Sequence, residues 1–186
     1  MTENSRKNRR IKKERKIVKT GTEIIKQINS MKGLPIWILA GLFLATSCDS
    51  RRVFEGKKDF PNRYWVFNNP AEFEFDINNT DKSYNLLFNI RNTAKYQFQN
   101  IYLQYYLEDS TGRLLSRDLK NVQLFNAITG VPLGKGLGDI YDIEKVFLED
   151  YNFQNPGKYR LRIDQFMRQD SLPEILAVGL RVEFSE

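Results

Sequence analysis

The sequence contains no histidine and only one cysteine, and these absences exclude several kinds of chemistry. Without imidazole groups there is no histidine-based catalytic triad, no histidine ligand for a metal and no imidazole acid or base. A single cysteine allows neither an intrachain disulfide nor a zinc site made of thiolates. The residue types therefore favour a protein that is not an enzyme and that holds no metal or other cofactor.

The sequence also lacks a long apolar run. Residues 34–47 are 14 residues without a charge, whereas a membrane-spanning helix needs about 20 and the apolar core of a secretory signal about 7–15. Basic residues precede this run, and the small residues Ala45, Thr46 and Ser47 lead directly to Cys48. This order is typical of a bacterial lipoprotein signal, in which the cysteine thiol receives the diacylglycerol. A short membrane span and a buried free cysteine are the alternatives.

Positive charge is concentrated at the N-terminus. The formal charge of +6 divides into +8 before Cys48 (11 basic and 3 acidic residues) and −2 from Cys48 onward (18 basic and 20 acidic residues). We therefore expect residues 1–30 to be a basic N-terminal extension or a long n-region, and residues 31–47 to be the lipoprotein signal peptide. Translation could start at Met1 or at Met31. Export would remove the basic part, so we expect no nucleic-acid partner; a nucleic-acid-binding arm is the alternative for this charge density.

The remaining chain shows the period of two that is typical of strands, without a long helical period. Phe73, Phe75 and Ile77, for example, alternate with acidic residues. Strands are expected near residues 64–68, 72–78, 83–91, 100–107, 113–120, 143–149, 158–166 and 175–184. One-sided alternation indicates antiparallel sheets with one buried face. This pattern predicts that residues 63–186 form an all-β domain, an antiparallel β-sandwich of immunoglobulin or jelly-roll type with about eight strands. A closed barrel is the structural alternative.

The segment between the cysteine and this domain has the composition of a linker. Residues 48–62 are polar and are interrupted by Gly56 and Pro61, residues that commonly mark loops. We expect this segment to form a tether, which reaches at most about 50 Å when fully extended. A tether of that length would hold the domain clear of the lipid headgroups.

A glycine-rich string at residues 134–139 is the most unusual local pattern. A phosphate-binding loop needs a Lys-Ser or Lys-Thr pair that opens a helix, and none follows here. The pattern predicts a flexible loop or bulge whose glycines adopt positive φ and whose backbone could contact a partner. The candidate partner-binding residues are Gly134, Lys135, Gly136, Gly138 and Asp139.

Aromatic and acidic side chains supply the other candidates. Tyr64, Trp65 and Phe67 fall on one expected strand, where their rings could stack on sugars; the alternative is that the core and a loop cover them. Acidic residues at 76–81 and 139–144 lack the ligand spacing of an EF-hand calcium loop, so we expect solvated strand-end acids and no metal. Carboxylate pairs could in principle serve a hydrolase, but nothing in the sequence selects one pair.

Several strings in the sequence resemble the gliding-motility lipoprotein family GldH. They are CDSRRVF from Cys48, YNL from Tyr84 with NIRN from Asn89, GKGLGDI from Gly134, PGKY from Pro156, QFMR from Gln165 and VGLRVE from Val178. The resemblance covers residues 48–186, and the glycine string with the Met-Arg and Val-Gly-Leu-Arg segments is its most specific part. The extension at residues 1–30 departs from the family.

The resemblance implies a lipid-anchored protein of the Bacteroidetes cell envelope, required for gliding motility and linked to the type IX secretion apparatus. It implies membrane contact through acyl chains such as palmitate on Cys48, protein partners in that apparatus, and neither catalytic residues nor a cofactor. We favour the outer membrane. Exported proteins of this phylum are often O-glycosylated at short Asp-Ser motifs, which makes Ser110 and Ser171, both at expected turns, candidate sites. A glycan-binding β-sandwich module is the alternative function.

Overall fold

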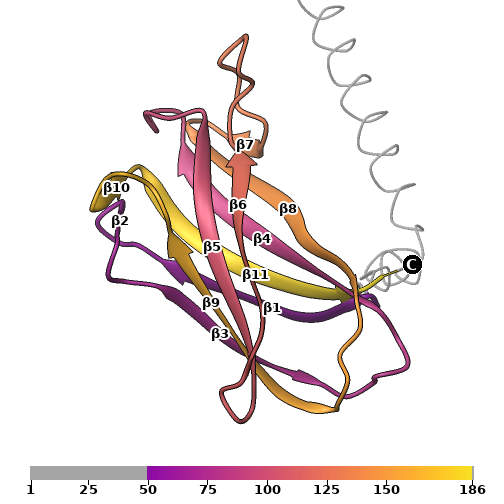
Figure 1. Ribbon diagram of the computed structural model, residues 1–186. Coiled ribbons are helices and arrows are strands. Elements are labelled where there is room, and N and C mark those ends of the chain that lie inside the picture. The colour runs from indigo at the N-terminus through magenta and orange to yellow at the C-terminus, as the bar shows by residue number, and fades with distance from the viewer. Residues whose placement is uncertain (1–49, 186) are drawn as a thin grey trace, which may run out of the picture. The chain divides into compact units, whose positions relative to one another are not determined.

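The computed structural model describes residues 50–185. In that part of the chain every regular element is a β-strand (Figure 1), which confirms the expected all-β fold. Among the described residues, no helix is long and apolar enough to cross a membrane. The predicted N-terminal extension, the signal peptide and the lipidation site at Cys48 lie outside the described residues.

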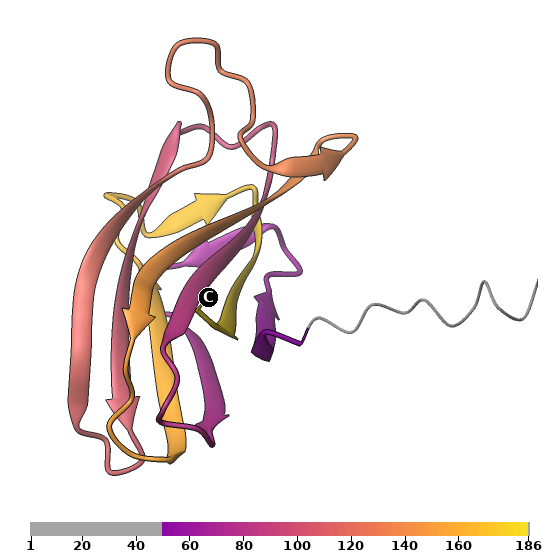
Figure 2. The same cartoon turned by 90° about the vertical axis from the view of Figure 1, so that its right-hand side faces the viewer.

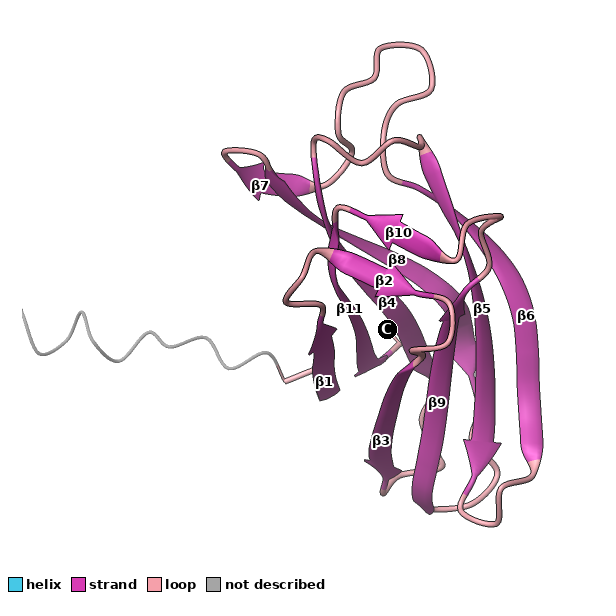
Figure 3. Ribbon diagram, turned by 90° about the vertical axis from the view of Figure 1, so that its left-hand side faces the viewer, coloured by secondary structure: helices cyan, strands magenta, loops and turns pink. Residues whose placement is uncertain are grey.

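The strands form two large antiparallel sheets and one small sheet (Figure 3). The five-stranded sheet has the order β1 (Arg52–Asp59), β11 (Ile175–Phe184), β4 (Tyr84–Thr93), β8 (Ile140–Tyr151) and β7 (Lys135–Leu137). The four-stranded sheet has the order β3 (Ala71–Ile77), β9 (Gly157–Gln165), β5 (Asn100–Asp109) and β6 (Leu114–Gln123). The third sheet pairs β10 (Ser171–Pro173) with β2 (Tyr64–Val66). Both large sheets have open edges, so the architecture is the expected sandwich.

Alternating side chains build the core between the two large sheets. β3 buries every second residue, including Phe73, Phe75 and Ile77, as the sequence predicted. From the five-stranded sheet, the ring of Phe88 meets Tyr105 of the four-stranded sheet with 6.4 Å between ring centroids. Burial of each large apolar side chain contributes about 1.5–3 kcal/mol. These buried rows therefore hold the two sheets face to face.

The chain just before the expected domain does not form a tether. Residues Arg52–Asp59 form β1, an edge strand whose Phe54 lies opposite Val182 of β11. The ring of Phe54 folds over Gly56, where an added Cβ would lie 2.8 Å from it, so this glycine serves packing. The strand has no recognisable pattern in the sequence, because Val53 and Phe54 are its only apolar side chains. The remaining side chains are charged, which is common on sheet edges.

The other expected strands are present with shifted ends. The predicted hairpin of β5 and β6 is confirmed, with Leu107 opposite Ser116. The strand expected at 64–68 is reduced to β2, whereas β8 extends beyond the expected 143–149 at both ends. β7 and β10 were not predicted, because strands of three residues are too short to show a recognisable alternation.

Candidate functional site

The glycine string forms a hairpin instead of the expected flexible loop. β7 pairs with the start of β8, and the partners Leu137 and Ile140 leave Gly138 and Asp139 as a two-residue turn. Gly138 has φ +69°, as a tight turn with glycine at its first central position requires. Figure 2 shows the hairpin projecting from the sandwich beside the loop that joins β6 to β7.

Gly134 and Gly136 permit a close approach of two strands. A Cβ on Gly136 would lie 2.2 Å from the carbonyl oxygen of Ile140, and a Cβ on Gly134 would lie 2.6 Å from that of Asp142. No side chain fits in that space, so β7 can lie against β8 only with glycine at both positions. Lys135 stands between them, exposed and opposite Asp142 in the register.

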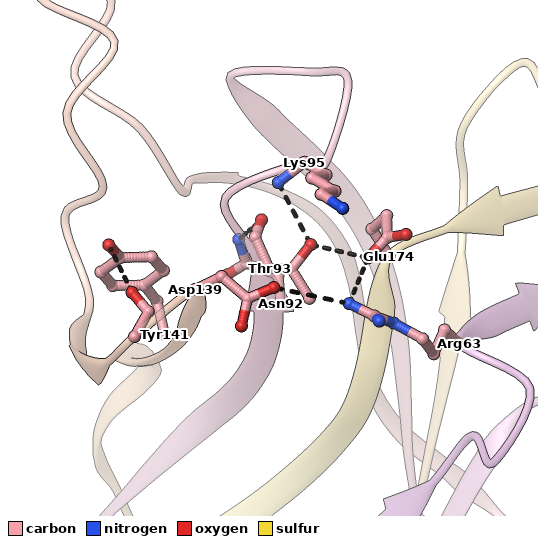
Figure 4. A network of polar contacts seen from close by, with 8 residues as sticks. Arg63, Asn92, Thr93, Lys95, Asp139, Tyr141 and Glu174 are labelled. Atoms are coloured by element: carbon pink, nitrogen blue, oxygen red, sulfur yellow. Dashed lines mark hydrogen bonds and ion pairs between the residues drawn. The ribbon is translucent and has the colours of Figure 1, made fainter.

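A polar cluster holds the turn of this hairpin to three other segments (Figure 4). The backbone amide of Ala94, which follows β4, donates to the carbonyl oxygen of Asp139 at 2.8 Å. The carboxylate of Asp139 lies 3.9 Å from Nη2 of Arg63. The same Nη2 donates to Oε2 of Glu174 at 2.8 Å. Arg63 therefore links the hairpin turn to the residue that joins β10 to β11.

Two buried polar side chains at the end of β4 complete the cluster. Thr93 is fully buried, and its Oγ1 donates to Oε2 of Glu174 at 2.7 Å and accepts from the amide of Lys95 at 3.1 Å. Nδ2 of the buried Asn92 donates to the carbonyl oxygen of Thr93 at 3.0 Å. A buried polar group destabilises the fold unless it is hydrogen-bonded. These hydrogen bonds therefore stabilise the arrangement of the segments that meet at the hairpin turn. No local pattern in the sequence points to the cluster, since its members come from four separate segments.

Apolar side chains are exposed on the hairpin and on the loop beside it. Leu137 at the end of β7 is 92% exposed, and Ile128 in the loop between β6 and β7 is 94% exposed. Val131, Leu133 and Ile140 are exposed as well. These five residues are called the apolar loop surface below. They lie on two neighbouring projections of the domain, where they are available for contact with a partner.

The predicted aromatic contact face is not intact, because its central ring is buried. Trp65 is 0% exposed and stacks on Phe60 with ring centroids 5.3 Å apart. Its Nε1 donates to the carbonyl oxygen of Asn69 at 2.9 Å. Tyr64 and Phe67 are exposed. Trp65 therefore belongs to the core, and the sugar-stacking interpretation of these three rings is wrong for that residue.

Phe67 contributes instead to an apolar groove on the outer side of the four-stranded sheet. The groove has a volume of about 820 Å³ and is lined by Phe67, Phe98, Tyr102, Leu119, Phe166, Met167, Arg168 and Gln169. The rings of Phe67, Tyr102 and Phe166 are roughly half-exposed. No stretch of the sequence predicts this groove, because its rings lie on separate elements that only the fold brings together.

Several other outward positions of the four-stranded sheet carry paired charges. Arg160 lies 3.4 Å from a carboxylate oxygen of Glu74. Arg162 lies 3.2 Å from that of Asp164, and its guanidinium stands 4.1 Å from the ring centroid of Tyr106. Burial raises the pKa of Asp164 above its ordinary value, and the charge of Arg162 opposes this effect. These are the contacts of an ordinary solvated sheet face.

The remaining candidate residues do not gather into one site. Both carboxylate oxygens of Asp142 accept from the guanidinium of Arg91, at 2.8 and 2.9 Å. Within residues 50–185, no group of three His, Cys, Asp or Glu side chains could hold a metal ion. Ser110 lies in an exposed turn, as expected, whereas Ser171 is half-buried in β10 and is not in a turn. O-glycosylation of these two serines stays a prediction.

An antiparallel sandwich that follows a leader of lipoprotein composition is the arrangement expected of a lipid-anchored protein of the cell envelope. The chain belongs to the GldH lipoprotein family, whose family model matches residues 52–182. This confirms the resemblance that the sequence motifs indicated.

Two relatives support the assignment over nearly their whole length. The gliding motility lipoprotein GldH of Flavobacterium johnsoniae is 31% identical over 160 residues, which is 82% of this chain and 97% of that protein. A homologue of it from Christiangramia forsetii is 30% identical over 152 residues, 78% of this chain and 91% of that protein. Among solved structures, the VP2 subviral particle of infectious bursal disease virus matches 73% of this chain and 33% of that chain, with 14% identity and a TM-score of 0.39. At that score the likeness carries no argument about fold or function.

Proposed function

We propose that this protein is a non-catalytic docking or assembly component of the gliding machinery, linked to type IX secretion and anchored through lipid on Cys48. The observation that carries the proposal is the apolar loop surface, in which Leu137 and Ile128 stand almost fully exposed. The family relationship supports the gliding part of the proposal. The outer membrane is the proposed location.

The hairpin is built in a way that suits docking. Leu137 stands next to a turn whose shape is set by Gly136 and Gly138, and the backbone amide of Ala94 donates to the carbonyl oxygen of Asp139 in that turn. A side chain presented on a rigid element loses little conformational freedom when a partner covers it. Covering one Leu or Ile in that way contributes about 1.5–3 kcal/mol.

A mutation in the apolar loop surface tests the proposal. Leu137→Asp is compared with Leu114→Asp, a matched change at a half-exposed leucine at the start of β6. Both proteins should fold and reach the membrane. We expect Leu137→Asp to lose the gliding or secretion proteins that crosslinking recovers from the envelope, and to abolish gliding, while Leu114→Asp keeps both. Unchanged recovery of those proteins by Leu137→Asp would contradict the docking role.

Glycan binding is the second candidate function, and the apolar groove is the observation that favours it. Tyr102 and Phe166 could stack on sugar rings, and Arg168 and Gln169 at the groove could bond sugar hydroxyls. Tyr102→Ala should then reduce retention on envelope polysaccharide, whereas Tyr64→Ala, outside the groove, should not. Equal retention of the two variants would leave docking as the sole function.

A further inference from the structure

The anchor and the folded domain are separated by very little chain. Cys48 is the only cysteine of the sequence, and three residues lie between it and the first residue of β1, Arg52. Four Cα–Cα steps span at most about 14 Å. A connection of this length cannot hold the sandwich clear of the bilayer, whereas the expected tether would have done so.

The start of β1 lies at one defined end of the five-stranded sheet. The amide of Phe184 donates to the carbonyl oxygen of Arg51, and the amide of Ser185 donates to that of Ser83, both at 2.9 Å. Lys82 lies over the ring of Phe184, 4.3 Å from its centroid. We call this end, with the segments 50–52, 78–83 and 152–156, the anchor end.

The side chains of the anchor end suit lipid headgroups. None of the large apolar side chains that are exposed in the described part of the chain lies in its three segments. Apart from Pro156, its exposed residues are polar or charged, such as Asp81, Lys82 and Asn152. Such a surface can contact hydrated headgroups but gains nothing by entering the acyl region.

The apolar loop surface lies at the opposite end of the same sheet. β4 runs from Tyr84 at the anchor end to Thr93, and the next residue, Ala94, bonds Asp139 of the hairpin turn. Ten strand residues span about 30 Å, and Figure 1 shows the hairpin beyond them. Leu137 is thus turned away from the bilayer that holds the lipid.

We infer that the anchor end rests on the headgroups of the anchoring membrane and that the apolar loop surface faces away from it at a nearly fixed height. The partner is then a protein that presents an apolar surface at the height of the hairpin, about 30 Å or more above the headgroups. The inferred position of the domain rests only on the lipid anchor at Cys48. The inferred partner also rests on the proposed docking function.

Depth-dependent quenching tests the position without any partner. Because the thiol of Cys48 is acylated in the mature protein, Asp81→Cys and Ile128→Cys each provide one reactive thiol for a fluorophore. The lipidated proteins are placed in vesicles of phosphatidylethanolamine and phosphatidylglycerol that carry a headgroup quencher. We expect strong quenching at position 81 and none at position 128. Equal quenching, or stronger quenching at position 128, would overturn the inference.

Linker insertion tests the fixed height in cells. A Gly-Ser linker of about 12 residues between Asp49 and Ser50 adds about 20 Å of reach. It should lower the effective concentration of the docking surface, and with it partner recovery, by about tenfold. The same linker at Asn68, in the exposed turn between β2 and β3, is the control and should change nothing. Full recovery with the first linker would refute the fixed height, whereas no recovery even by the unmodified protein would refute the docking function instead.

Discussion

Arg63 and Glu174 are bonded to each other twice, and both adopt the left-handed backbone conformation. The amide of Glu174 donates to the carbonyl oxygen of Arg63 at 2.7 Å, and Nη2 of Arg63 donates to Oε2 of Glu174 at 2.8 Å. Their φ angles are 59° and 67°. A non-glycine residue in that conformation is strained and persists only where its surroundings hold it. The pair thus stores strain beside the hairpin that carries the apolar loop surface.

The first prediction concerns the shared carboxylate of this pair. Glu174→Ala should destabilise the domain by about 1–3 kcal/mol, because the buried hydroxyl of Thr93 loses its acceptor while the backbone strain remains. Urea unfolding measures the change. Glu149→Ala, at an exposed position of β8, is the control and should stay within about 0.5 kcal/mol of the unchanged protein. Equal midpoints for the two variants would show that the cluster does not stabilise the fold.

The second prediction separates two neighbouring aromatic residues. Trp65→Ala should cost about 3–5 kcal/mol, since it empties a buried site against Phe60. Tyr64→Ala removes a half-exposed ring and should cost less than about 0.5 kcal/mol. Thermal unfolding of both variants measures the difference. If Trp65→Ala folds with unchanged stability, the ring does not belong to the core.

The third prediction concerns the approach of β7 to β8. Gly136→Ala places a Cβ against the carbonyl oxygen of Ile140, and overpacking of this kind costs about 1–3 kcal/mol. We expect the strain to open the hairpin, so that its amides exchange faster with solvent while those of β3 and β5 do not. Hydrogen exchange resolves the two regions. Lys135→Ala, which leaves the close approach intact, should exchange like the unchanged protein; equal rates in Gly136→Ala would contradict the packing argument.

The fourth prediction follows from the raised pKa of Asp164. Burial raises the pKa of this carboxyl above its value in the unfolded chain, so the folded protein holds the proton more tightly. The stability linked to that proton is present below the unfolded pKa and is lost as the pH rises through the folded pKa. Asp164→Asn should therefore gain stability relative to the unchanged protein as the pH rises through this window. Urea unfolding at several pH values measures the difference.

Asp109 supplies a control of opposite sign. The hydroxyl of Thr111 donates to its carboxylate and lowers the pKa of Asp109. Its contribution is present above the unfolded pKa and is lost as the pH falls through the folded pKa. Asp109→Asn should therefore lose stability relative to the unchanged protein as the pH rises. If the two variants follow the same trend, the assignment of the two carboxyl environments is wrong.

The sequence by itself determined the strand alternation of the domain and, through its motifs, the family. A strand turns alternate side chains to opposite faces, whatever strand it pairs with. The sequence therefore predicts the buried sets of two strands, which are Phe73, Phe75 and Ile77 in β3 and Ile101, Leu103 and Tyr105 in β5. The same local reasoning failed at β1. An edge strand with charged side chains shows too little alternation to differ from a linker.

Only the tertiary structure decided which residues meet. Trp65 is buried, although the sequence pattern placed it on one exposed face with Tyr64 and Phe67. Phe67, Tyr102 and Phe166 lie together in one groove. The tertiary structure also placed Arg63 beside Glu174, 111 positions along the chain. The local alternation of apolar and polar residues indicates which face of its own strand a side chain lies on. Contacts between distant segments depend on strand order and register, which no single stretch of sequence contains.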